Sequence, residues 1–471
     1  MHDEICLLSA TEQAAALRAK ELSARELMGA HLARIEAINP SVNAIVTLVA
    51  EQALERARVA DERLANGVEP GPLHGLPVAH KDLHLTAGIR TTFGSPAFAE
   101  HVPEQTDLVV ERLNSAGAIT IGKTNTPEFG AGSHTFNPVF GTTRNPYDTT
   151  KSAGGSSGGA AAALACGLQP IADGSDMGGS LRNPASFCNV VGLRPSPGRV
   201  PNWPAPLGWS SLGVQGPMAR TVTDVALTLS VIAGPDDRCP TSLSEPGALF
   251  REPLSAPRRG LRLAWSPDLG GLPVESDVLA VLTEQVRVFE RLGYEVELAC
   301  PDFTCADEVF RTMRAWQFEH SHGPLVDRRP ELVKPSLRQN AAIGRRLTGS
   351  DISRAEALRT TLYHRMRTFF TEYDALLLPV SQVLPFDADL EYPAEVAGVP
   401  TADYIDWMRS CYYVSVVGNP ALSVPAGFTP DGLPVGLQIV GGHRGELALL
   451  QLGHAFEQAT GFGKQTPGQS R

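Results

Sequence analysis

Apolar and polar residues follow a helical period over the first 66 residues of the chain. Leu27, Ile35 and Ile38 form one apolar stripe, which Asn39-Pro40 is predicted to end. A second helix is predicted over about 48–65. Two capping boxes indicate further helix starts, and they are formed by Ser9 with Glu12 and by Ser23 with Glu26. We therefore expect residues 1–66 to form a helical layer that packs on the rest of the protein.

From residue 73 onward, short apolar runs of strand length alternate with amphipathic stretches of helix length. The predicted strands lie within 73–83, 118–124, 167–176, 260–267, 294–299, 374–380, 421–427 and 434–441. The clearest helices lie within 107–117, 221–234, 276–292 and 446–460. This alternation indicates α/β architecture with a covered sheet. We expect an α/β/α sandwich around a large, mixed, twisted central sheet, with residues 67–471 as one compact unit.

Composition narrows the class of protein. Of the 471 residues, 42% are hydrophobic and 19% are charged, which excludes a disordered chain. The net charge of −11 argues against nucleic acid or an acidic membrane surface as a partner. The start "MHDEICLLSATEQ" lacks the basic segment of a signal peptide. We expect a cytoplasmic globular protein, monomeric or homodimeric, without a nucleic-acid or membrane partner.

Cysteine and histidine residues do not form a recognisable metal-binding pattern. The seven cysteines are scattered, and the nearest pair, Cys300 and Cys305, has no histidine at zinc-finger spacing. His320 and His322 would point to different faces of a helix. We expect thiols without disulfide bonds, no metal site and no cofactor.

Two short motifs match known patterns but stand in an unsuitable context. The segment 117–124, "GAITIGKT", fits the phosphate-binding P-loop, yet a helix precedes it and its variable positions are strand-like. The segment 154–158, "GGSSG", fits the nucleophile elbow of α/β-hydrolases, yet polar residues precede it where an apolar strand is required. Neither motif is predicted to have the function that its pattern suggests.

Three other segments carry candidate chemistry. Lys81 follows an apolar strand in "GLPVAHKDL", Ser156 lies 75 residues later in "GGSSGG", and Ser180 follows two glycines in "SDMGGSLRNPA". Consecutive glycines let backbone amides turn toward one point, where they can stabilise an oxyanion formed by serine attack on a carbonyl. Each segment taken alone is also typical of a strand end, a flexible loop or a turn.

Together these segments resemble the amidase signature family in order, spacing and flanking residues. The resemblance spans almost the whole chain, with its signature core at about 73–220, and includes "GKTNTPEFG", "NPVFGTTRNPYD" and "GLPVGLQIVGG". It implies that Ser180 is a nucleophile, that Ser156 is a bridging serine after a cis bond to Gly155, and that Lys81 is the base. It also implies that Ser157 orients the lysine. The backbone amides implied to form an oxyanion hole are those of Met177, Gly178, Gly179 and Ser180.

The implied chemistry requires a neutral lysine. A free lysine has a pKa of about 10.4, which burial lowers by several units. The apolar "LPVA" before Lys81 supplies that burial, and Asp82 would oppose it, so we expect the Asp82 carboxylate to point away from the ammonium. The implied reaction is hydrolysis of a C–N bond through an acyl-enzyme on Ser180.

The substrate is predicted from the variable loops. We expect a small, apolar or aryl amide, anilide, carbamate (urethane) or ester, bound among aromatic side chains. Predicted pocket residues are Gly132, Trp209, Trp316, Tyr404 and Trp407, and Phe318 lies in the same stretch as Trp316. Core packing explains each aromatic residue equally well. The alternative function is the amidase subunit of a glutamyl-tRNA amidotransferase complex, which releases ammonia from glutamine.

Overall fold

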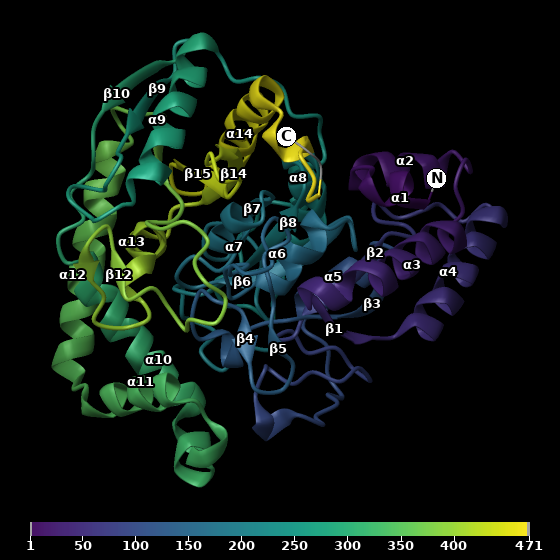
Figure 1. Ribbon diagram of the computed structural model, residues 1–471, viewed down its shortest axis with the longest axis horizontal. Helices are drawn as coiled ribbons and strands as arrows, with labels where there is room; N and C mark the ends of the chain where they lie inside the picture. The colour runs from purple at the N-terminus through teal and green to yellow at the C-terminus, as the bar shows by residue number, and fades with distance from the viewer. Residues whose placement is uncertain (1, 469–471) are drawn as a thin grey trace.

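An eight-stranded mixed sheet forms the centre of the molecule, and helices cover both of its faces (Figure 1). The computed structural model describes residues 2–468. The strand order is β10-β9-β11-β15-β14-β7-β8-β6. These strands are β6 (Ile171–Asp176), β7 (Val191–Arg194), β8 (Val214–Ala219), β9 (Arg262–Trp265), β10 (Glu295–Leu298), β11 (Ala375–Pro379), β14 (Ala421–Phe428) and β15 (Pro434–Gly441).

Strand β11 shows how both faces of this sheet are buried. Ala375 and Leu377 pack into one hydrophobic cluster, whereas Leu376 and Leu378 pack into another. Because successive side chains of a strand point to opposite faces, the two clusters are the two layers of a sandwich. Strand β11 pairs parallel with β9 and antiparallel with β15, so the sheet is mixed. The predicted α/β fold with a covered, mixed central sheet is confirmed.

Each face of the sheet has its own set of helices. The first cluster includes residues from α6 (Gly158–Ala165), α8 (Val222–Ile232), α9 (Ser276–Arg291) and α14 (Glu446–Thr460). The second cluster includes residues from α10 (Ala306–Arg328), α12 (Gly349–Phe369) and α13 (Arg409–Val417). Figure 1 shows α10, α12 and the neighbouring α11 (Pro335–Arg346) on the opposite side of the molecule from the N-terminal helices.

The N-terminal helices are α1 (His2–Leu7), α2 (Ala10–Arg18), α3 (Ala24–Val42) and α4 (Ala50–Ala65). Both predicted capping boxes are present, at Ser9 with Glu12 and at Ser23 with Glu26. The carboxylate of Asp224 on α8 accepts hydrogen bonds from the backbone N–H groups of Ala10 (3.0 Å) and Thr11 (2.9 Å). A side chain of the core therefore satisfies the free N–H groups at the start of α2 and fixes this helix to the core.

The N-terminal segment differs from the sequence prediction at two places. Helix α3 does not end at Asn39-Pro40 but continues through Pro40 to Val42, where Asn43 takes a left-handed φ of 51°. No strand was predicted within residues 1–66, but residues 45–48 form the strand β1 (Ile45–Leu48). Strand β1 pairs with a strand that lies about 75 residues further along the chain. Because this pairing is distant in sequence, no local pattern predicted the strand.

A second, three-stranded sheet has the order β1-β3-β2 and contains β2 (Pro77–Lys81) and β3 (Ile119–Thr124). Strand β2 lies beside β6 of the large sheet, but side chains replace the main-chain ladder there. The Asp173 carboxylate accepts from the backbone N–H of Lys81 (2.9 Å), and Gln169 Oε1 accepts from that of Ala79 (2.6 Å). These side-chain acceptors separate the two sheets and hold the end of β2 against β6.

The remaining elements are short or peripheral. They are α5 (Leu108–Ser115), α7 (Arg182–Phe187), the strand pairs β4 (Phe136–Asn137) with β5 (Gly141–Thr142) and β12 (Glu395–Val396) with β13 (Val399–Pro400), and six 3₁₀ turns. The P-loop-like segment is strand β3, with the side chain of Lys123 buried. In residues 2–468, no disulfide joins the cysteines and no helix is long and apolar enough to cross a membrane.

The close packing at the start of α6 predicts a large effect of adding one methyl group. A Cβ at Gly159 would lie 2.3 Å from the backbone N of Asn125 and 2.7 Å from the backbone O of Ala44. We expect Gly159→Ala to lower the free energy of unfolding by about 1–3 kcal/mol, as overpacking does. Urea denaturation followed by circular dichroism measures the change.

The matched control is Gly29→Ala, in the interior of α3. Nothing lies within 4 Å of a Cβ at Gly29, so this variant should gain about 0.5–1 kcal/mol from helix propensity. A Gly159→Ala protein as stable as the Gly29→Ala protein would contradict the packing described here.

Candidate active site

Lys81 is the last residue of β2, and its side chain is completely buried. Its Nζ contacts three hydroxyl groups: those of Ser156 (2.7 Å), Ser157 (2.8 Å) and Ser175 (3.0 Å). Two of these serines were predicted to contact the lysine. The contact with Ser175 was not predicted.

The surroundings of Lys81 favour the neutral amine. Burial lowers the pKa of Lys81 to about 7, and the charges of Asp176 and Asp173 oppose this only in part. The adjacent Asp82 is turned away, since its carboxylate accepts hydrogen bonds from the backbone N–H (3.1 Å) and the hydroxyl of Thr92. The prediction that Asp82 points away from the lysine is confirmed.

The stretch 154–159, "GGSSGG", is buried and firmly held. The Gly155–Ser156 peptide bond is cis, as the family resemblance implied. The hydroxyl of Thr135 donates to the backbone O of Gly154 (2.8 Å), and the hydroxyl of Ser133 donates to that of Gly155 (3.1 Å). Ser156 therefore lies in a segment whose carbonyl groups are fixed by neighbouring side chains, and α6 begins two residues later.

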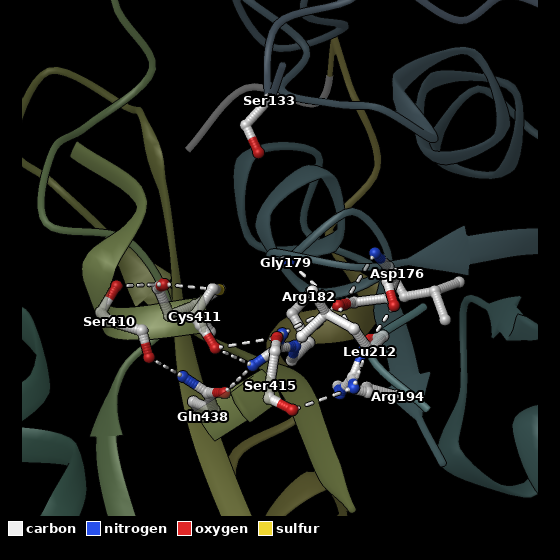
Figure 2. Close-up of polar contacts among 12 residues, drawn as sticks. Ser133, Asp176, Gly179, Arg182, Arg194, Leu212, Ser410, Cys411, Ser415 and Gln438 are labelled. Atoms are coloured by element: carbon white, nitrogen blue, oxygen red, sulfur yellow. Dashed lines mark hydrogen bonds and ion pairs between the residues drawn. The ribbon is translucent and has the colours of Figure 1, made fainter. Parts of the chain in front are cut away.

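Asp176, the last residue of β6, holds the glycine turn that follows it. Its carboxylate accepts from the backbone N–H of Gly179 (2.9 Å) and contacts the guanidinium groups of Arg182 (2.9 Å) and Arg194 (3.0 Å). All three charged side chains are fully buried. Figure 2 shows Asp176 close to both arginines and to Gly179. Burial alone would raise the pKa of Asp176, but the two arginines hold it well below its usual range.

The turn presents three of the four predicted backbone amides. The N–H groups of Met177, Gly178 and Ser180 have no hydrogen-bond partner within residues 2–468. The structure differs from the prediction at Gly179, because its N–H already donates to Asp176 and its φ is 121°. Three N–H groups around one serine can bind a negatively charged oxygen.

One cavity of about 350 Å³ exposes Ser156, Ser175 and Ser180 together. No hydrogen bond joins the hydroxyls of Ser156 and Ser180 in the described part of the chain. Gly132, a predicted pocket residue, lines this cavity. The larger apolar side chains on its wall are Leu83, Phe129, Met177, Leu207, Phe310, Phe318 and Met408.

Known proteins share this architecture over nearly its whole length. The amidase family model matches residues 26–450. This chain belongs to the amidase signature family. It is 37% identical to an acylamidase of Rhodococcus erythropolis, over 98% of each chain. It is 36% identical to a glutamyl-tRNA(Gln) amidotransferase subunit of Methylococcus capsulatus, over 97% of this chain and 98% of that one.

The solved structure of a bacterial aryl acylamidase of the amidase signature family has the same fold. It superposes with a TM-score of 0.89 at 29% identity and covers 97% of this chain, while this chain covers 96% of it. This amidase signature protein is an enzyme that hydrolyses amide C–N bonds.

The aromatic pocket predicted for this amidase signature enzyme was largely wrong. Trp209 is 80% exposed, Trp407 is buried in the core at 1% exposure, and neither lines the cavity. Trp316 packs against the second hydrophobic cluster and Tyr404 belongs to that cluster, and neither residue lines the cavity. Phe318, from the same helix as Trp316, does line it. Which face of α10 meets the cavity depends on its packing against α11 and α13, which the sequence pattern does not reveal.

Several cavity residues were missed. Ser175 lies two positions after Asp173 in β6, so strand alternation was a usable signal that both face β2. His84 and Asp107 line the cavity, and His84 Nδ1 hydrogen-bonds Asp173 (2.8 Å). Burial raises the pKa of Asp107 to about 7 and lowers that of His84. Arg314 on α10 also lines the cavity, and no sequence signal marked it.

The Asp176 cluster predicts a severe effect from removing one charge. We expect Asp176→Asn to lower the free energy of unfolding by about 3–5 kcal/mol, because it leaves the buried guanidinium groups of Arg182 and Arg194 without their carboxylate. Chemical denaturation measures this change. Glu55→Gln, which removes an exposed partner of Arg58, should leave stability nearly unchanged. Equal denaturation midpoints for the two variants would contradict the role given to Asp176.

Proposed function

We propose that this enzyme hydrolyses small amides with Ser180 as nucleophile, Ser156 as proton relay and Lys81 as base. The observation that carries the proposal is the fully buried Lys81, which contacts Ser156 in a cavity shared with Ser180. A serine hydroxyl is a weak nucleophile and needs a base that is neutral at working pH. Burial lowers the pKa of Lys81 to about 7, so a large fraction of the lysine side chains is neutral at neutral pH.

The number of protons on Lys81 determines the direction of its hydrogen bonds. A neutral amine has two N–H donors and one lone pair, but Lys81 contacts three hydroxyls. Ser157 and Ser175 accept the two N–H groups, so the hydroxyl of Ser156, the nearest of the three, donates to the lone pair. The Ser156 oxygen is then free to accept a proton from Ser180.

The catalytic steps follow from this arrangement. Ser180 Oγ attacks the carbonyl carbon while its proton passes through Ser156 to Lys81. The N–H groups of Met177, Gly178 and Ser180 stabilise the oxyanion. When the C–N bond breaks, the proton returns through Ser156 to the departing amine. Water then attacks the acyl-enzyme on Ser180 with the same relay and releases the carboxylic acid.

The relay needs Ser180 to approach Ser156. No hydrogen bond joins the two hydroxyls in the described residues, although both face the cavity. Rotation about the Cα–Cβ bond of a serine moves its hydroxyl, and catalytic hydrogen bonds commonly tighten when substrate binds. We therefore assign formation of the Ser180–Ser156 hydrogen bond to the substrate complex.

The proposed substrates are small apolar or aryl amides and anilides, with carbamates and esters as alternatives. The cavity of about 350 Å³ suits a small substrate, and its wall combines polar groups with apolar side chains such as Phe129, Phe310 and Phe318 that can contact an apolar or aryl body. Similarity to an acylamidase and to an aryl acylamidase supports the same class. The similarity to a glutamyl-tRNA(Gln) amidotransferase subunit supports a second candidate function, in which the chain releases ammonia from glutamine within a complex.

Activity of the isolated chain distinguishes these two functions. We expect the purified protein alone to hydrolyse 4-nitroacetanilide, followed by release of 4-nitroaniline, and Ser180→Ala to reduce the rate to background. A fluorophosphonate probe should label the wild-type protein and not Ser180→Ala. Labelling of a folded Ser180→Ala protein would exclude Ser180 as nucleophile. Ammonia release from glutamine only with partner chains and charged tRNA would favour the second candidate.

The pKa of Lys81 predicts the pH dependence of the reaction. Below about pH 7 the lysine is protonated and cannot accept a proton, so kcat/KM for 4-nitroacetanilide should fall about tenfold per pH unit and level off above pH 7. Lys81→Ala should lower kcat/KM by about 10,000-fold. A flat profile between pH 5 and 8, or near-normal turnover by Lys81→Ala, would exclude lysine as base.

A further inference from the structure

One wall of the cavity carries a buried arginine without a carboxylate partner. Arg314 lines the same cavity as Ser156 and Ser180, and only 4% of its surface is exposed. Within residues 2–468, no carboxylate oxygen lies within 4.0 Å of its guanidinium. Its hydrogen bonds go to Asn340 Oδ1 (2.6 Å) and to the hydroxyl of Tyr404.

In other buried arginines of this protein, carboxylates or backbone carbonyl groups compensate the charge and the N–H donors more completely. Arg182 and Arg194 both contact the Asp176 carboxylate, and Arg199 contacts that of Glu446 (3.1 Å). Arg220 donates to four backbone carbonyl groups. A guanidinium has five N–H donors, and Arg314 uses two of them on protein groups. Arg314 therefore keeps unused donors together with an uncompensated charge.

The groups around Arg314 do not supply a negative charge. Burial raises the pKa of Tyr404, so its phenol stays neutral at neutral pH. The centroid of the Phe318 ring lies 3.9 Å from the guanidinium carbon, and such a contact compensates only part of a buried charge. Burial, assisted by the charge of Arg314, lowers the pKa of the nearby His322 to about 4, so His322 adds no second charge.

An arginine side chain cannot lose its proton under these conditions, so its burial costs free energy unless an anion pairs with it. Its planar fork of donors fits a carboxylate with two parallel hydrogen bonds. Building on the proposed function, we propose that Arg314 binds a carboxylate group of the substrate. The substrates are then amides with an apolar or aryl body and an anionic end.

The rest of the cavity agrees with this arrangement. Phe129, Phe310 and Met408 line it beside Arg314 and can contact an apolar body. Two protein carboxylates also line the cavity. Asp176 is neutralised by its two arginines, and burial raises the pKa of Asp107 to about 7, which reduces its repulsion of an anion. Asn340 and Tyr404 act as positioning residues, because they hold the guanidinium in place.

The test compares matched substrates that differ in one group. One pair is 4-acetamidobenzoate and 4-acetamidoacetophenone, in which a methyl ketone replaces the carboxylate on the amine side. The other pair is N-phenylsuccinamate and N-phenyl-4-oxopentanamide, with the change on the acyl side. Amine release is measured by chromatography. In at least one pair, we expect wild-type kcat/KM to be about 100-fold higher for the carboxylate than for the ketone.

Variants of Arg314 then identify the group responsible. Arg314→Gln should lower kcat/KM for the preferred carboxylate about 100-fold, mostly through KM, and change the ketone less than about threefold. Arg314→Lys, which keeps the charge but not the fork, should recover part of this loss. Arg338→Gln, which removes an exposed charge from α11, should leave both rates unchanged.

The outcomes separate this inference from the proposed function. Equal rates within both pairs for the wild-type protein overturn the carboxylate site, even if Arg314→Gln does not fold. The same conclusion follows if only 4-nitroacetanilide is hydrolysed, or if Arg314→Gln slows carboxylates and ketones equally. If the wild-type protein hydrolyses none of these amides, or if Ser180→Ala keeps full activity, the proposed function is overturned instead.

Discussion

The burial of a lysine that has no carboxylate in contact with its amine is the constraint on which this structure depends. Lys81 is fully enclosed, and three serine hydroxyls are its hydrogen-bond partners. Had Asp82 faced the amine, the ion pair would have kept the lysine charged. Instead the chain brings together the end of β2, the strand β6 and the buried "GGSSGG" segment, so that only neutral hydroxyls meet the amine. The proposed chemistry needs this arrangement, because a protonated lysine cannot accept a proton.

Two buried carboxylates build the framework around this lysine, and each is held by hydrogen bonds from groups other than Lys81 Nζ. Asp173 accepts from His80 and His84 and from the backbone N–H of Lys81, which places β2 against β6. Asp176 pairs with two arginines and fixes the glycine turn before Ser180. Both carboxylates thus orient backbone, while their charges raise the pKa of the lysine only as secondary effects.

Lys81 and Arg314 show two different results of burying a cation in one protein. A lysine can release its proton, so burial converts it into a base. An arginine stays charged, so a buried guanidinium is stabilised when an anion binds to it. Lys81 meets hydroxyls in the interior, and Arg314 lies at the cavity wall between Phe318, Tyr404 and Asn340. The first arrangement serves the proposed reaction, and the second serves the proposed selection of substrates.

The sequence by itself determined the fold class, because strand and helix periods are local properties of the chain. The cis bond before Ser156 and the grouping of Lys81 with two serines were implied by the resemblance of three short segments to the amidase signature family. Tertiary structure decided which side chains line the cavity. Trp407 and Tyr404 lie in the core, whereas Ser175, Asp107 and Arg314 reach the cavity. Tertiary structure also determined that residues 45–48 form strand β1, because its partner strand is distant in the chain. The physical reason is that burial and pairing depend on contacts between segments far apart in sequence, which no local pattern records.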